Sequence, residues 1–141
     1  MTHPLFNTSN SVREKLAQGD TAYGMFLHLG HSEVAEMVGS LGLDFVILDM
    51  EGSPMTSREV VPQLQGLNGS GCAGIVRVPR HDTHLIGHAL DIGANGVMIP
   101  KVENAEEAKI VASATRYAPM GTRGINAFRA TAYGENEQEY M

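Results

Sequence analysis

Charged side chains stand at the ends of two apolar segments, where they could meet in one site. The run F-V-I-L-D ends at Asp49, Glu51 follows two residues later, and Arg77 lies near the end of the run A-G-I-V-R-V. Side chains alternate along a strand, so Asp49 and Glu51 share one face and Arg77 lies on the matching face of the next strand. Two carboxylates and a guanidinium could orient a keto acid, a water or a metal-bound ligand. The alternative is a buried ion pair that only fixes the strands.

The sequence has six histidines, which raise the question of a general base or a metal site. His28 ends the first predicted strand and could act there as a base, although a hydrogen-bonded structural histidine explains it equally well. His84 and His88, which follow His81, would share one face of a helix at a spacing that zinc can use. That helix would cover the outside of the sheet, so we expect surface histidines there and no metal ligand.

Strand-like and helix-like segments alternate along the chain. Continuous apolar runs typical of buried strands cover Tyr23–Leu29, Phe45–Asp49, Ala73–Val78 and Gly96–Pro100. Helical spacing or capping residues predict helices at Ser11–Gly19, His31–Leu41, 57–67 and 83–92, and one after Asn104. Thr56 or Ser57 is the expected cap of the third helix, and Asp82 that of the fourth. The tail from Gly134 is acidic and polar, either frayed or a helix start.

This rhythm predicts an α/β fold with a parallel sheet and right-handed βαβ units. No G-x-G-x-x-G opens the first helix, which argues against a dinucleotide-binding fold. A (β/α)₈ TIM barrel needs about 250 residues, so 141 residues supply about four of its eight units. We therefore predict residues 1–141 to be one partial TIM-barrel domain, with strands in the order 1-2-3-4 and helices on one face.

The amino-acid composition argues against some classes of binding partner and indicates a cellular location. The net charge of −6 argues against nucleic acid and anionic membranes. The single cysteine, Cys72, excludes an intramolecular disulfide and suits a reducing compartment. No secretory leader and no apolar stretch of membrane-spanning length is present, so the expected location is the cytoplasm.

Four segments of the chain resemble the HpcH/HpaI aldolase family, which includes class II 2-keto-3-deoxy acid aldolases and macrophomate synthase relatives. The segments are G-L-D-F-V-I-L-D-M-E at 42–51, I-V-R-V-P at 75–79, G-A-N-G-V-M-I-P-K-V-E-N-A-E-E-A at 93–108 and R-Y-A-P-M-G-T-R-G at 116–124. The last string is the most specific. The resemblance covers nearly all of the chain and only the first half of the family's usual barrel.

The resemblance implies a metal-dependent aldolase, a carbon–carbon lyase that acts on pyruvate-derived 2-keto acids. A divalent metal (magnesium, manganese or cobalt) would bind pyruvate and stabilise its enolate, which adds to an aldehyde or arises by cleavage. Arg77 matches the family's arginine that stabilises the enolate charge. Asp49 and Glu51 match the acidic part of a D-x-E-H motif, whose histidine transfers protons.

The chain departs from the family pattern in two places. Gly52 stands where the motif has its histidine, and such acid–base help is typically worth about 10²–10⁴-fold in rate. His28 or His31 could substitute. The family's metal-binding Glu and Asp follow the fourth strand, so we expect no metal ligand in this chain.

Three functions therefore stay open: a lyase, a carbon–carbon-forming synthase of the same family, and a catalytically silent truncated homologue that acts only by assembly. The expected small-molecule partners of the first two are a keto acid and an aldehyde. Half a barrel would also expose its edge strands and an inner face bearing Phe45, Ile47 and Ile75, with Met25 or Phe26 beside them, which predicts a homo-oligomer.

Overall fold

The chain forms a four-stranded parallel sheet whose strands follow their order in the sequence. The computed structural model describes residues 11–140. The strands are β1 (Gly24–Leu27), β2 (Phe45–Asp49), β3 (Ala73–Arg77) and β4 (Gly96–Met98), in the order β1-β2-β3-β4. Each neighbouring pair is parallel. The predicted α/β fold with four successive strand–helix units is confirmed.

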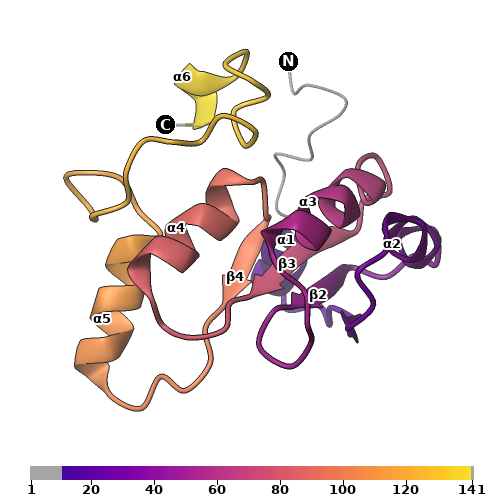
Figure 1. Cartoon of the computed structure of the whole chain (residues 1–141), viewed down its shortest axis with the longest axis horizontal. Coiled ribbons are helices and arrows are strands. Elements are labelled where there is room, and N and C mark those ends of the chain that lie inside the picture. Colours follow the sequence, from indigo (N-terminus) through magenta and orange to yellow (C-terminus); the bar gives the residue numbers. More distant parts are fainter. Residues whose placement is uncertain (1–10, 141) are drawn as a thin grey trace.

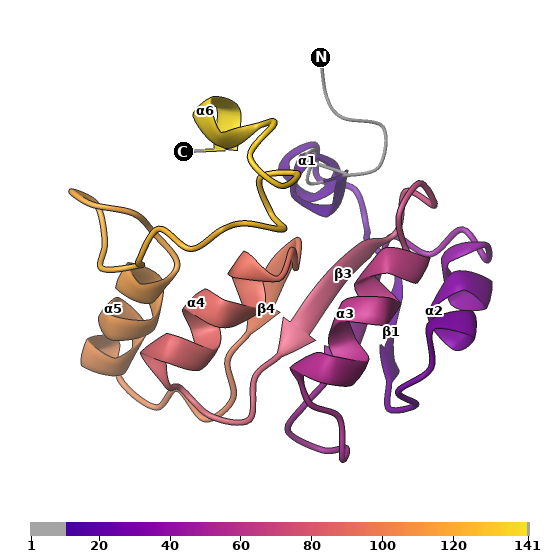
Figure 2. The ribbon, with the colours of Figure 1, turned by 45° about the horizontal axis from the view of Figure 1, so that its top comes forward.

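Helices α2 to α5 cover one face of this sheet (Figures 1 and 2). The helices described are α1 (Ser11–Ala17), α2 (Ser32–Gly39), α3 (Ser57–Gly66), α4 (Thr83–Asp91), α5 (Ala105–Ala114) and α6 (Glu137–Tyr140). Figures 1 and 2 show α2 to α5 side by side along the sheet, with α1 and the yellow C-terminal segment beyond the amino ends of the strands. Right-handed crossovers between strands in sequential order place every connecting helix on the same side.

The main core lies between the sheet and these helices. Val46, Leu48 and Val76 point from the two central strands toward the helices and are fully buried. They belong to one cluster with Val60 of α3 and Ile86 of α4. Burial of each such side chain contributes about 1.5–3 kcal/mol. Because alternate residues fill this core, the residues between them face the opposite side of the sheet.

The predicted caps are present at three helices. Thr56 forms a capping box with Glu59 at the start of α3. Asp82 accepts hydrogen bonds from two backbone N–H groups at the start of α4, and Asn104 accepts one at the start of α5. Each cap satisfies N–H groups that have no partner within the helix, which fixes where the helix begins.

One prediction of burial is wrong. The segment Tyr23–Leu29 was expected to be buried on both faces, but Phe26 is 41% exposed and only Leu27 lies in the core. The reason is that β1 is an edge strand of this sheet and has one neighbour. The helix α2 packs through Ala35 and Val38, whereas Met37 is 64% exposed.

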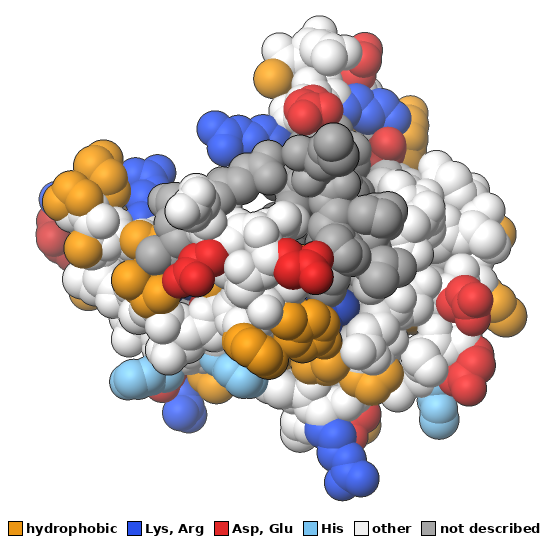
Figure 3. Space-filling model, turned by 90° about the horizontal axis from the view of Figure 1, so that it is seen from above, with side chains coloured by type: hydrophobic (Ala, Val, Ile, Leu, Met, Phe, Trp, Pro, Cys, Tyr) orange, Lys and Arg blue, Asp and Glu red, His pale blue; other side chains and the backbone are white. Residues whose placement is uncertain are grey.

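On the surface seen from above, acidic and basic side chains lie interspersed (Figure 3). Within residues 11–140 no helix is both long enough and apolar enough to cross a membrane.

Candidate active site at the carboxyl ends of the strands

Asp49 and Arg77 form the centre of the site. They are paired in the parallel register at the ends of β2 and β3, as the alternation of side chains predicts. Arg77 Nε lies 2.8 Å from Asp49 Oδ1, and Arg77 Nη2 lies 2.5 Å from Oδ2. The Asp49 side chain is fully buried and that of Arg77 is 24% exposed. A two-point contact of this kind fixes the plane of the guanidinium.

The loop that follows β2 closes over the same carboxylate. The backbone N–H groups of Glu51 and Gly52 each donate to Asp49 Oδ1 over 2.9 Å. The Ser53 hydroxyl donates to the Asp49 carbonyl oxygen and thereby ties the loop back to the strand. Asp49 therefore anchors the loop as well as the arginine.

Asp49 is an anion in this setting. Hydrogen bonds from Arg77, and then from the Gly52 and Glu51 backbone, outweigh the cost of burial and hold the pKa of Asp49 well below its ordinary value of 3.8. The same contact with Asp49 raises the pKa of Arg77 further. A carboxylate that already accepts several hydrogen bonds is a weak base, so Asp49 is suited to hold other groups in place.

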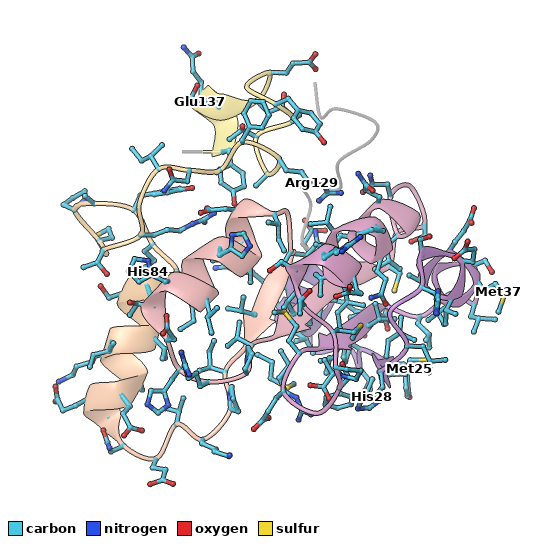
Figure 4. All side chains as sticks on the ribbon, in the orientation of Figure 1. Met25, His28, Met37, His84, Arg129 and Glu137 are labelled. Carbon is cyan, nitrogen blue, oxygen red and sulfur yellow. The ribbon has the colours of Figure 1, made fainter. Side chains whose placement is uncertain are left out.

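His28 joins the cluster from β1. It follows Leu27, which pairs with Leu48, so the register places His28 beside Asp49. His28 Nε2 lies 2.9 Å from Asp49 Oδ2, and the imidazole side chain is 51% exposed. Figure 4 places His28 at the end of the molecule opposite Arg129 and Glu137. The structure thus brings together His28, Asp49 and Arg77 from three successive strands.

Glu51 forms a second, more accessible acidic position beside this pair. Its side chain is 23% exposed, with Oε2 3.5 Å from Arg77 Nε and Oε1 3.7 Å from Lys101 Nζ. Lys101 follows β4, so all four strands contribute to the same end of the sheet. Sequence reasoning missed Lys101, although the rule that selected Arg77, a charge at the carboxyl end of a strand, also applies to it.

Phe26 is a further residue of the site that sequence reasoning did not assign to it. The Arg77 guanidinium carbon lies 4.9 Å from the centroid of the Phe26 ring. The His28 ring is stacked on Phe26, with centroids 6.0 Å apart and planes 17° apart. Because Phe26 and His28 are two residues apart on one strand, they share a face, and alternation along β1 is the signal that could have found Phe26.

Gly52 approaches the centre of the site closely. A Cβ atom on Gly52 would lie 2.7 Å from Asp49 Oδ2 and 3.1 Å from Arg77 Nη2. A side chain at this position therefore requires the Asp49–Arg77 pair to shift.

The residues present do not fit a metal ion. Among residues 11–140 no group of three or more His, Cys, Asp or Glu side chains is placed to hold one. Both oxygens of Asp49 accept hydrogen bonds from Arg77, so this carboxylate binds the guanidinium in place of a metal ion. His81, His84 and His88 are all exposed, as expected for surface histidines, and His88 contacts Ser57 over 3.0 Å.

Four strand–helix units with charged residues at the carboxyl ends of the strands correspond to one half of a (β/α)₈ barrel, with those residues at the end where barrel enzymes place their active sites. The chain belongs to the HpcH/HpaI aldolase/citrate lyase family, whose sequence model matches residues 22–139. A crystal structure of an HpcH/HpaI aldolase/citrate lyase family protein from Burkholderia cenocepacia superposes with a TM-score of 0.86 at 33% identity, over 94% of this chain and 55% of that one.

Curated relatives carry the names of aldolases. The 4-hydroxy-2-oxovalerate aldolase of Novosphingobium aromaticivorans is 40% identical over 126 residues, which are 89% of this chain and 48% of that protein. The pyruvate aldolase of Rhizobium etli is 40% identical over 126 residues, or 89% of this chain and 50% of that protein. The chain therefore spans about half the length of the curated relatives it matches.

Proposed function

We propose that this chain carries the arginine-bearing half of a pyruvate-using aldolase site, a carbon–carbon lyase that works through an enolate. The observation that carries the proposal is the Arg77 guanidinium, which Asp49 fixes at the carboxyl end of β3. An enolate and a carboxylate are both anions, and a fixed cation aimed at them lowers the energy of the charged intermediate. The names of the relatives favour pyruvate as the product of cleavage.

In the cleavage direction a base removes the proton from the C4 hydroxyl of a 4-hydroxy-2-keto acid. The C3–C4 bond breaks, the hydroxyl-bearing carbon leaves as an aldehyde, and the electron pair becomes the enolate of pyruvate. A proton then adds at C3 and gives pyruvate. Arg77 offsets the negative charge of the enolate, and loss of one such donor costs about 10²–10³-fold in rate. We assign Asp49 the role of holding Arg77, and Glu51 that of a substrate- or water-orienting carboxylate.

The family generally uses a divalent cation, and residues 11–140 place no ligand set together for one. We infer that the ligands come from outside this half of the barrel, and no step above depends on them. The buried cysteine, Cys72, suits the cytoplasmic location that we propose.

The test is the exchange of the pyruvate methyl protons for deuterium, followed by NMR in D₂O with and without magnesium. We expect the Arg77→Lys variant to exchange at least about 100-fold more slowly than the parent, because lysine cannot make the two-point contact with Asp49. The matched control is Arg80→Lys, since Arg80 is 74% exposed and its ion pair with Asp82 is 3.6 Å long. Equal rates in the parent and Arg77→Lys would refute the assignment.

A silent homologue that acts by assembly is the second candidate, and the glycine at position 52, where the family motif has its histidine, favours it. Oxalate, a dianion shaped like the pyruvate enolate, separates the two. Binding of oxalate that requires Arg77, without any deuterium exchange, would identify a binding-competent but silent half-site. A synthase of the same family would run the same enolate step in the direction of bond formation.

We also propose that copies of the chain associate. Within residues 11–140, β1 and β4 each have a strand on one side only, and Phe26, on the face away from the helices, is 41% exposed. Open edges and exposed apolar side chains favour pairing with another chain. Sedimentation at micromolar concentration should show a dimer or larger species, and a monodisperse monomer would contradict this proposal.

A further inference from the structure

The proposed aldolase chemistry needs a group that moves a proton, and the position that holds this histidine in the family is Gly52. We propose that His28 is the proton-transfer residue of this chain, with Nδ1 as the atom that takes and returns the proton. This inference rests on the proposed function and names a residue for its acid–base step. Three features of the described residues support it.

The first feature is the close approach of the His28 imidazole to the Asp49 carboxylate. Asp49 Oδ2 lies 2.9 Å from His28 Nε2, and the fully buried Asp49 is an anion that can only accept. The negative charge beside Nε2 therefore favours a proton on that nitrogen. A neutral His28 held in that way carries its lone pair on Nδ1, so the carboxylate selects the tautomer that can act as a base.

The second feature is the position of the ring. His28 is stacked on Phe26, and the same Phe26 lies 4.9 Å from the Arg77 guanidinium carbon. The imidazole and the proposed enolate-binding cation are therefore held against one aromatic ring. The His28 side chain is 51% exposed, which leaves room for a substrate to reach it.

The third feature links His28 to Gly52. The carboxylate oxygen that His28 contacts, Asp49 Oδ2, is the atom that a Cβ at Gly52 would approach to 2.7 Å. A side chain at 52 and the imidazole of His28 would thus converge on the same oxygen from two different elements. The chain keeps glycine at 52 and supplies an imidazole from β1.

The charged groups around the imidazole come from several elements. Asp49 on β2 contacts it directly, and Arg77 on β3 lies over the shared Phe26 ring. Glu51 pairs with Arg77 at 3.5 Å and with Lys101 at 3.7 Å. From α3, Glu59 lies against Gly30 in the loop that follows His28, and it is engaged with Thr56. Asp49 is the group in direct contact, so it decides the orientation of the ring.

Each proton that moves in the cleavage step has a donor and an acceptor. In cleavage, Nδ1 of neutral His28 accepts the C4 hydroxyl proton as the C3–C4 bond breaks and the aldehyde leaves. The imidazolium then returns that proton to C3 of the enolate. In the exchange reaction of pyruvate in D₂O, the same nitrogen removes a C3 proton and returns a deuteron obtained from solvent.

The test compares His28→Gln with the parent. Glutamine keeps an N–H donor for Asp49 but has no basic nitrogen. We expect methyl exchange to fall by about 10²–10⁴-fold, while the affinity for oxalate at pH 8 changes by less than about twofold. Imidazole added to His28→Ala should restore part of the exchange. The matched control is His31→Gln, because His31 caps α2 on the same loop without a side-chain cap bond and should leave exchange unchanged.

A second measurement does not depend on turnover. Long-range proton–nitrogen NMR of the parent should show His28 as the Nε2–H tautomer at neutral pH, and a proton on Nδ1 would overturn the inference. Exchange that is equally fast in His28→Gln, or lost instead in His31→Gln, would overturn it too. Failure of the proposed function looks different: oxalate binding would then be absent or independent of Arg77 in every variant.

Discussion

Replacing Arg77 by methionine should destabilise the fold as well as the site. The variant keeps an apolar stem over Phe26 but leaves a fully buried carboxylate without its cation. Removing one partner of a buried pair usually costs about 3–5 kcal/mol. Asp49 keeps hydrogen bonds from the Glu51 and Gly52 backbone and the close imidazole of His28, so we expect the lower end, about 3 kcal/mol, in the free energy of unfolding.

Urea unfolding at pH 7 measures this loss, with Arg80→Met as the matched control. Arg80 is 74% exposed and its contact with Asp82 is 3.6 Å long, so its removal should change stability by less than about 0.5 kcal/mol. A loss below about 1 kcal/mol in Arg77→Met would refute the view that Asp49 depends on Arg77.

The loss should also depend on pH. The pKa of folded Asp49 lies below the ordinary value of 3.8, so its contribution to stability is present above that pH and is lost as the pH falls below it. In Arg77→Met the pKa of Asp49 is no longer lowered by the guanidinium, and protonation can relieve the buried charge. The difference between parent and variant should therefore be largest above about pH 5 and shrink toward about pH 3. A constant difference over this range would contradict the mechanism.

Other predictions concern parts of the fold away from Arg77. Gly74→Ala should lower the free energy of unfolding in urea by about 1–3 kcal/mol, because the new Cβ would lie 2.5 Å from Leu64 Cδ2. Gly87→Ala in α4 should raise it by about 0.5–1 kcal/mol, because the new Cβ would meet one atom at 3.9 Å and alanine favours the helix. Thr56→Ala should lower stability by about 1 kcal/mol through loss of the α3 cap, without changing deuterium exchange; an unchanged midpoint would show that the cap is dispensable. Iodoacetamide at pH 8 should modify Cys72 slowly in the native protein and rapidly in urea, because burial raises the pKa of its thiol to about 11; equal rates would indicate an open core.

The sequence was sufficient to predict the pairing of Asp49 with Arg77. Both positions follow from the two-residue period of strands and from the rule that barrel sites lie at carboxyl ends, neither of which needs long-range information. The caps at Thr56 and Asp82 are equally local, because they depend on residues within one helical turn. The sequence left open whether Arg77 serves function or only an ion pair that fixes the strands, and the burial of Asp49 shows that the pair has a structural role.

Properties that depend on neighbours in space could not be predicted in this way. Phe26 has the apolar character of a buried strand, and only the place of β1 at the edge of the sheet explains its exposure. The contact between Glu51 and Lys101 joins residues fifty positions apart. The role of His28 stayed open because a single sequence does not tell which carboxylate, if any, an imidazole will meet.

The sequential strand order also bears on how the protein opens. Each strand pair is joined by one helical unit, so every pairing closes a loop of moderate length, which favours rapid and stepwise folding. β2 and β3 are paired on both sides, whereas β1 has a single neighbour. Local unfolding begins where strands have the fewest partners, so β1 should exchange its amide hydrogens before β2 and β3 do. An opening of that kind would withdraw His28 and leave the Asp49–Arg77 pair intact, so the histidine should leave its place in the site more often than that pair separates.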